Sequence, residues 1–183
     1  LAIHLTFAFI TFAYTLWVAL DLIYPERKLP VLELRKIARI ALVILIIQII
    51  YGGFVAGLNA GLIHNHWPLM SDGQFIHDSV FIEKSTLFLN LIEGKSGVQF
   101  VHRTMAYVVV GLILALYFTS RKHLLSVLQK RGIKTLVVIV FLQFTLGVFT
   151  LLYGVPLWLG LLHQVMAFFL LTAMTFTLHR LSK

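Results

Sequence analysis

The chain has 183 residues, of which 60% are hydrophobic and only 12% are charged, and its mean hydropathy is +0.94. A soluble domain carries about 25% charged residues, so this composition excludes an ordinary soluble protein. The chain has no cysteine, which excludes disulfides, thiolate-ligated haem and iron–sulfur clusters within it.

Five apolar stretches are each long enough to cross a bilayer, which takes about 20 helical residues. They run from about Leu1 to Leu22, Ile37 to Leu58, Gly97 to Ser120, Thr135 to Tyr153 and Pro156 to Leu178. The sequence therefore predicts an all-α fold, a polytopic transmembrane bundle with about five spanning helices.

The net charge of +8 is concentrated in the links after the first and third stretches and at the end of the chain. The cationic residues there are Arg27, Lys28, Arg35, Lys36, Arg39, Arg121, Lys122, Lys130, Arg131, Lys134, Arg180 and Lys183. Because Lys and Arg gather on the cytoplasmic side of membrane proteins, we expect these links and the C-terminus to be cytoplasmic. The same distribution favours anionic lipid, and not nucleic acid, as the partner of the positive charge.

The chain begins at Leu1, inside an apolar stretch, and shows no signal peptide. The predicted topology places this first residue on the outer side. We therefore expect the chain to be a fragment of a longer protein with earlier helices.

One six-residue pattern occurs three times: His, two residues, Phe or Met, Ala, and Phe or Tyr. It begins at His4, His102 and His163. Histidine is rare inside a membrane and is usually functional there. The Ala lies one helical turn beyond the His, on the same face, and leaves room for a flat group beside the imidazole. The pattern indicates haem held by axial histidines.

His102 and His163 lie at matched depth. They follow the outer ends of their helices by about five and seven residues, which is roughly 8–10 Å. Two imidazoles at one depth on separate helices can ligate one iron from opposite faces. The alternative is that each histidine only hydrogen-bonds a neighbouring helix. The shared pattern and matched depth favour haem.

Two further residues are candidates for the same chemistry. Arg103 follows His102 without an acidic neighbour in its helix, and either a haem propionate or the outer headgroups would suit its charge. His4 has no evident partner histidine in this chain. It fits either a second haem site completed by earlier helices or a packed side chain at the end of the chain.

The segment from residue 59 to residue 96 is the one long predicted loop. It contains His64-Asn65-His66, which would make a weak metal site without a nearby carboxylate and is expected to be solvated. Asp72 and Asp78 are expected to be loop residues. Apolar residues in 80–92 have helical spacing and predict a helix along the membrane surface, with Trp67 at the interface.

A second, shorter repeat precedes two of the histidine helices. Gln48-x-x-x-Gly52 lies in the second stretch and Gln143-x-x-x-Gly147 in the fourth. The second and third stretches, and the fourth and fifth, therefore look like two copies of one helical hairpin. Gly52, Gly53, Gly57 and Gly61, in or just after the second stretch, are expected to allow close helix packing, and room for a cofactor is the alternative.

Taken together, these segments resemble the haem A synthase family. The matching segments are Gly52-Gly53-Phe-Val-Ala-Gly57-Leu-Asn-Ala-Gly61-Leu, Asn65-His66-Trp67-Pro68-Leu69-Met70, Val98-Gln99-Phe100-Val101-His102-Arg103, and Tyr153-Gly154-Val155-Pro156 followed by Leu161-Leu162-His163-Gln164. Their order and spacing agree across essentially the whole chain. The chain looks like the long-loop branch found in proteobacteria and mitochondria.

The resemblance implies eight helices in two pseudo-symmetric halves. Residues 1–36 would be the last helix of the N-terminal half and a cytoplasmic linker. Residues 37–183 would be the C-terminal four-helix half, with the outer loop 59–96. His102 and His163 match the axial ligands of a cofactor haem b, and His4 matches one histidine of the N-terminal site, where haem O reacts. The family's Glu-x-x-His-Arg motif, which would complete that site, is not in this chain.

The reaction implied by the resemblance is the oxidation of a methyl group of haem O to a formyl group, giving haem A for cytochrome oxidase assembly. The enzyme would be an oxidoreductase with haem b as an electron-transfer cofactor. Haem O, the lipid bilayer, a haem O synthase, cytochrome oxidase assembly factors and a second copy of the chain are the candidate partners. The location would be the bacterial, or the mitochondrial, inner membrane.

Two other functions are compatible with the same residues. A membrane b-type electron-transfer cytochrome would use His102 and His163 equally well. A transporter or structural subunit without haem would use buried polar residues such as Gln48, Gln143 and Gln164, but the predicted spans hold no deep Asp, Glu or Lys.

Overall fold

The computed structural model describes residues 2–25, 31–71 and 73–182 and is helical throughout these ranges apart from loops and one isolated bridge. The elements are α1 (Ala2–Ile23), α2 (Leu32–Gly57), a 3-10 turn (Ala60–Leu62), α3 (Ser79–Ile82), α4 (Leu87–Glu93), α5 (Lys95–Ser120), α6 (Val127–Leu152) and α7 (Leu157–Ser182). Within these ranges five helices, α1, α2, α5, α6 and α7, are long and apolar enough to cross a membrane. The predicted all-α bundle of about five spans is confirmed.

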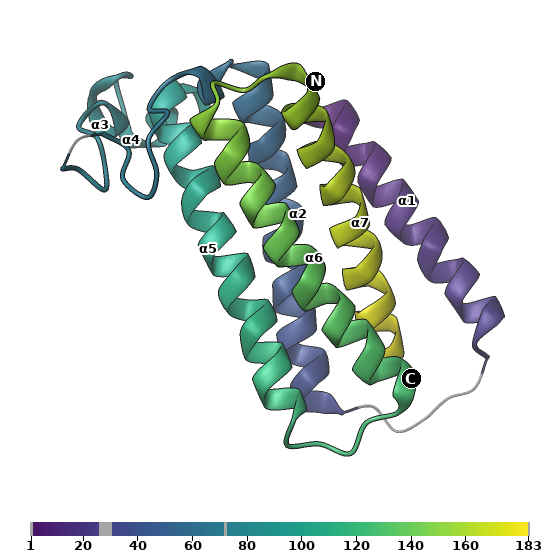
Figure 1. The fold of residues 1–183 in the computed structure, drawn as a ribbon. Coiled ribbons are helices and arrows are strands. Elements are labelled where there is room, and N and C mark those ends of the chain that lie inside the picture. Colours follow the sequence, from purple (N-terminus) through teal and green to yellow (C-terminus); the bar gives the residue numbers. More distant parts are fainter. Residues whose placement is uncertain (1, 26–30, 72, 183) are drawn as a thin grey trace.

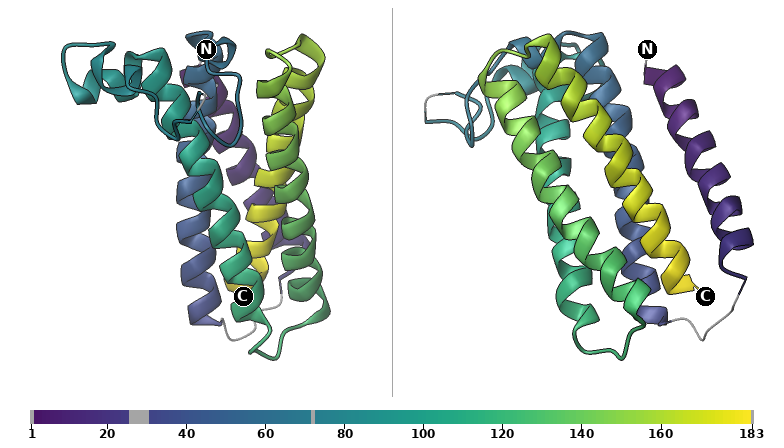
Figure 2. Two further views of the ribbon diagram at one scale, coloured as in Figure 1. Left: turned by 60° about the vertical axis from the view of Figure 1, so that its left-hand side comes forward. Right: turned by 45° about the vertical axis from the view of Figure 1, so that its right-hand side comes forward.

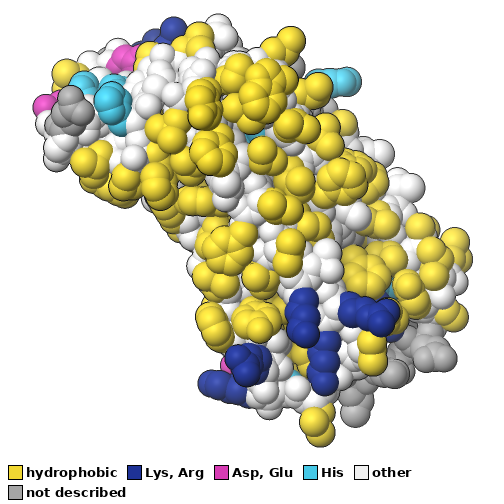
Figure 3. Space-filling view, viewed as in Figure 1, with side chains coloured by type: hydrophobic (Ala, Val, Ile, Leu, Met, Phe, Trp, Pro, Cys, Tyr) yellow, Lys and Arg dark blue, Asp and Glu magenta, His cyan; other side chains and the backbone are white. Residues whose placement is uncertain are grey.

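The long helices run alternately up and down (Figure 1). The N-terminus, the segment between α2 and α5 and the α6–α7 turn lie at one end, and the α5–α6 loop and the C-terminus lie at the other (Figure 2). Lys and Arg side chains gather near this second end (Figure 3). The arrangement agrees with the predicted alternation. Arg27, Lys28 and Lys183 of the cationic set lie outside the described residues.

Three predicted helix ends are wrong by several residues. Helix α2 begins at Leu32 and not near Ile37, α6 begins at Val127 and not near Thr135, and α7 continues to Ser182. The prediction followed the apolar residues, whereas the helices extend into polar turns. The start of α6 is fixed by a capping box, in which the Ser126 side chain accepts from the Gln129 N–H and the Gln129 side chain accepts from the Ser126 N–H.

The bundle is built from two closely packed helix pairs. Helix α2 lies along α5 and α6 lies along α7, with α1 placed outside them against α2 and α7 (Figures 1 and 2). Buried apolar side chains such as Leu45, Ile113, Leu136 and Met174 fill the centre. Because the two pairs face each other across this core, residues on α5 and α7 can approach one interior space.

Aromatic and charged contacts join α1 to α7. Phe9 and Phe168 occupy the same position in two of the histidine patterns, and their ring centroids are 6.4 Å apart. Near the opposite end, the fully buried His179 hydrogen-bonds the Asp21 carboxylate at 2.8 Å, and Trp17 packs edge-on against its ring. The contacts place α1 firmly on the bundle. The assignment of residues 1–36 to a separate half stays a prediction.

The outer segment is a folded cap and not one continuous helix. The predicted helical stretch over 80–92 is divided into α3 and α4, because the buried Asn90 accepts from the Lys84 N–H and donates to the Phe81 carbonyl across the intervening turn. The Glu83 carboxylate accepts from the first N–H groups of α5. Asp78 lies at the start of α3, and Asp72 lies outside the described residues.

Candidate functional site

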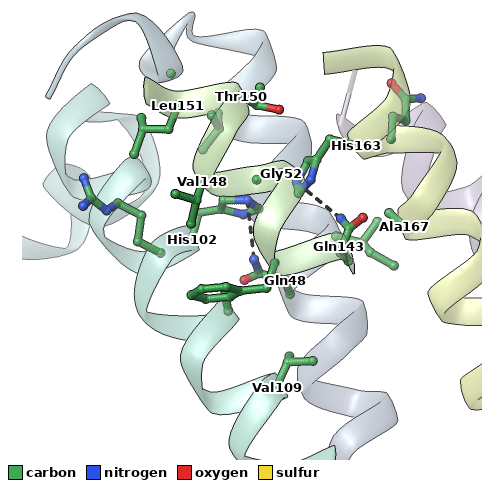
Figure 4. A pocket seen from close by; sticks show the side chains of 18 of the residues that line it. Gln48, Gly52, His102, Val109, Gln143, Val148, Thr150, Leu151, His163 and Ala167 are labelled. Carbon is green, nitrogen blue, oxygen red and sulfur yellow. Dashed lines mark hydrogen bonds between the residues drawn. The ribbon is translucent and has the colours of Figure 1, made fainter. Parts of the chain in front are cut away.

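A cavity of about 290 Å³ lies between α2, α5, α6 and α7, toward the end that carries the outer segment. Its wall is largely apolar. His102 from α5 and His163 from α7 both line it, and Figure 4 shows them on opposite sides of the same space. The structure therefore brings together the two histidines that matched depth predicted to share a site.

On the first side, α2 supplies two residues that contact the His102 ring. The amide nitrogen of Gln48 lies 3.4 Å from His102 Nε2. Gly52 follows one helical turn later, and a Cβ atom at that position would lie 3.3 Å from Cε1 of the same ring. A side chain at position 52 would therefore crowd the imidazole of His102.

The second side repeats this arrangement with α6 and α7. The amide nitrogen of Gln143 lies 3.3 Å from His163 Nε2. A Cβ atom at Gly147 would lie 2.8 Å from Cε1 of His163, a contact that a real Cβ atom essentially never makes. The short Gln-x-x-x-Gly repeat is thus a structural repeat: each copy supplies one amide and one gap to one histidine. The sequence revealed the repeat but not its contacts with the imidazoles.

Buried polar atoms without partners gather at this cavity. They include Nδ1 of His102 and of His163, Oε1 of Gln48 and of Gln143, and the hydroxyl of Tyr107. Buried polar groups in proteins are nearly always hydrogen-bonded. Neutral imidazoles facing an apolar cavity, with glycine gaps beside both rings, fit an iron macrocycle that takes two axial nitrogens.

Arg103 leaves the cavity wall toward the outer segment. Its guanidinium donates to the carbonyl oxygens of His66, Pro68 and Leu69 at 2.9–3.1 Å, and to that of His64 at 3.4 Å. These carbonyls give the charge the acceptors that its own helix lacks. The predicted propionate contact of Arg103 stays a prediction, and no pattern in the sequence indicated the contacts with these carbonyls.

Replacing Arg103 with Lys is expected to loosen residues 64–69. One ammonium cannot reach the carbonyls that the planar guanidinium spans, and each lost bond to a charged donor is worth about 1.5–3 kcal/mol when buried and less at this partly exposed position. We expect hydrogen exchange in a peptide covering 61–70 to become roughly tenfold faster by mass spectrometry. Arg121→Lys, at the exposed end of α5, is the control. Unchanged exchange in Arg103→Lys would show that Arg103 does not hold the segment.

Other side chains fasten the outer segment over the end of the cavity. Gln99 donates to the carbonyls of Ala60 and Ile63. Asn65 donates to the carbonyl of Leu151 near the end of α6 at 2.8 Å. Trp67 lines the cavity, and its ring lies 6.3 Å from that of Phe144. These contacts cover the cavity on its outer side.

The loop histidines do not form a metal site in the described part of the chain, where no group of three suitable ligands occurs. His64 hydrogen-bonds Ser96 at 3.0 Å and packs on the ring of His77, whose Nδ1 lies 2.7 Å from Ser79 Oγ. Burial lowers the pKa of His64, and the neighbouring His77 lowers it further. His64 is therefore a partly buried structural residue and not the solvated residue that we expected.

His4 lies apart from the cavity. It is exposed on α1, whereas Leu5 and Phe9 of the same helix reach the cavity wall. Its position on the outside of α1 agrees with a site separate from that of His102 and His163. Its predicted role at a second haem stays a prediction.

Comparison with known proteins identifies the family of this membrane protein. The chain matches the COX15-CtaA family model, described as a cytochrome oxidase assembly protein, over residues 1–175. The chain belongs to the COX15-CtaA family. The family resemblance found in the sequence is thereby confirmed.

Several curated COX15-CtaA relatives carry the name heme A synthase. The chain is 76% identical to that of Flavobacterium johnsoniae over 184 residues and 71% identical to that of Flavobacterium psychrophilum over 183 residues. It is 36% identical to the heme A synthase of Parvibaculum lavamentivorans. Each match covers 100% of this chain but only 52–54% of the relative, so the chain spans about half the length of these proteins. No solved structure matches the chain.

Proposed function

We propose that this chain is the haem b-binding half of a haem A synthase. One observation carries the proposal: two helix pairs each present one partly buried histidine to the same apolar cavity, with a glycine gap beside each ring. The names of the curated relatives support the assignment to haem A synthesis.

In this proposal His102 and His163 would hold the iron of haem b. Bound haem b would supply a one-electron carrier, since two axial histidines leave no open position on the iron. The apolar wall and Trp67 would keep water from the macrocycle. Arg103, next to His102 in the sequence and on the cavity wall, would contact a propionate by exchanging one or more of its bonds to loop carbonyls.

The whole enzyme would be an oxidoreductase that oxidises a methyl group of haem O to the formyl group of haem A. His4 would belong to the site of haem O. The candidate partners are a haem O synthase, cytochrome oxidase assembly factors and a second copy of the chain, and the location would be a bacterial inner membrane, in line with the bacterial relatives. A b-type cytochrome without haem-modifying activity would bind the same haem b but would not need His4.

A reduced-minus-oxidised optical spectrum of the purified protein, with an acid extract of its haem, tests the proposal. We expect a low-spin b-type spectrum. In the full-length protein supplied with haem O, His4→Ala is expected to keep this spectrum and to lose haem A formation. Absence of a haem band after loading would contradict the haem site, and wild-type haem A yield in His4→Ala would contradict the role of His4.

A further inference from the structure

Gln48 and Gln143 are polar residues within the spans, and the established family membership gives them no role. We propose that they are positioning residues of the haem-free protein. Each amide hydrogen-bonds Nε2 of one cavity histidine and orients the ring for metal binding. The hydrogen bond is broken when the metal binds that nitrogen. The consequence for haem rests on the proposed function, whereas the state of the imidazoles concerns this chain alone.

In this proposal the contacts select which ring nitrogen carries the proton. The amide nitrogen of Gln48 faces His102 Nε2 at 3.4 Å, and that of Gln143 faces His163 Nε2 at 3.3 Å (Figure 4). An amide nitrogen can only donate, so Nε2 must accept with its lone pair. The proton of each neutral ring then lies on Nδ1.

The glycine gaps lie against the Cε1 atom of each ring. The Cε1–Nδ1 edge of His102 lies against Gly52, and a Cβ atom there would be 3.8 Å from Nδ1. At Gly147 an added Cβ atom would lie 2.8 Å from Cε1 of His163 and at nearly equal distances, 3.5 and 3.6 Å, from its Nδ1 and Nε2. Both Nδ1 atoms are buried and without a hydrogen-bond partner. Each ring thus lies between a glycine and an amide, and in the proposal Nε2, which faces the amide, is the nitrogen that a metal reaches once the amide moves.

A metal binds the deprotonated nitrogen of a neutral imidazole. The glutamine selects that form in advance, so binding exchanges a hydrogen bond for a coordination bond and no proton has to leave Nε2. The hydrogen bond stabilises the haem-free state only. It therefore makes the empty site more stable and opposes haem binding by the value of one hydrogen bond.

Neither glutamine has a second use in the structure. The Oε1 atoms of Gln48 and Gln143 are buried and have no hydrogen-bond partner. Burying an amide within a membrane span is unfavourable unless it is bonded. Two helices of one chain nevertheless place the same residue type on the same ring nitrogen, four residues before the glycine that faces that ring.

Histidine-selective ¹⁵N labelling tests the haem-free state in bilayers. We expect two of the histidine rings to be neutral and protonated on Nδ1. Gln48→Met should change the signals of one of these rings, and Gln143→Met those of the other. Protonation of Nε2 in both cavity rings of the wild-type protein would overturn the proposal. This result needs only the wild-type spectrum, so it can be read even if the variants do not fold.

Thermal unfolding of the haem-free and the haem-loaded protein separates this role from a general structural one. Gln48→Met and Gln143→Met should lower the Tm of the haem-free protein and leave that of the haem-loaded protein unchanged or higher. Haem affinity should rise about fivefold, which is the value of one ordinary hydrogen bond. Destabilisation of both states alike, or weaker haem binding, would overturn the proposal.

Replacing the donor amide with an acceptor is expected to change haem affinity in the opposite direction. A carboxylate at position 48 or 143 can only accept, so Gln48→Glu or Gln143→Glu favours a proton on Nε2 and should weaken haem binding at least tenfold. Gln74→Met and Gln74→Glu, in the exposed outer segment, are matched controls. A wild-type protein with Nδ1–H rings that takes up no haem would support the positioning role and contradict the proposed haem site.

Discussion

Replacing either His102 or His163 with alanine is expected to abolish low-spin haem b in the protein. Each imidazole is the one axial donor that its helix presents to the cavity, so its loss leaves the iron with a single protein ligand. The substitution also removes the partner of a partly buried glutamine amide. The ratio of haem to protein and the reduced-minus-oxidised spectrum measure the effect.

His179→Ala is the matched control, because His179 is also buried and lies on the same helix as His163 but outside the cavity. Its loss should reduce stability, since it bonds Asp21 across to α1, yet the purified protein should keep its haem. An unchanged haem content and spectrum in both His102→Ala and His163→Ala would show that these histidines are not the ligands.

Adding a side chain at Gly147 is expected to reduce haem binding nearly as much. A Cβ atom there would lie 2.8 Å from Cε1 of His163, so Gly147→Val must displace the ring or separate α6 from α7. Overpacking of this kind costs about 1–3 kcal/mol, which corresponds to a roughly 5- to 150-fold loss of affinity when the displaced group is a ligand. Haem titration of the purified variants measures it.

Valine substitutions at the other glycines are expected to have graded effects on haem binding. At Gly52 the contact with His102 would be 3.3 Å, so Gly52→Val should have a smaller effect than Gly147→Val. Gly111 on α5 has no atom within 4 Å of an added Cβ, and Gly111→Val should leave haem binding unchanged. Equal effects at the three positions would indicate a general response of the helices to β-branched residues and not a contact with the imidazoles.

The spans and the site were predictable from the sequence for different reasons. Span number follows from the length of apolar runs, which depends on composition alone. The meeting of His102 and His163 followed from depth, because equal distances from one membrane face bring two helical residues to one level. Neither prediction needed the rotation of a helix about its axis.

The features that the sequence did not predict depend on that rotation or on loop contacts. Whether Gln48 faces His102 or lipid is decided by how α2 turns against α5, which no spacing within one helix specifies. The carbonyls around Arg103 and the turn held by Asn90 belong to a loop without a repeating pattern. The early start of α6 could have been recognised from Ser126 and Gln129, which have capping-box spacing.

The hydrogen-bonded cover over the cavity also has a consequence for how a ligand gets in. Opening the cavity toward the aqueous side would break the hydrogen bonds that Arg103 and Gln99 donate to carbonyls of the outer segment and that Asn65 donates to the Leu151 carbonyl. The wall between α5 and α6, in contrast, consists mainly of apolar side chains, and these can separate without breaking either glutamine–histidine contact. A flat apolar ligand dissolved among the lipid tails therefore has a lower barrier to lateral entry between the helices than to entry from the aqueous side. The bilayer would then be the route by which such a ligand reaches the cavity.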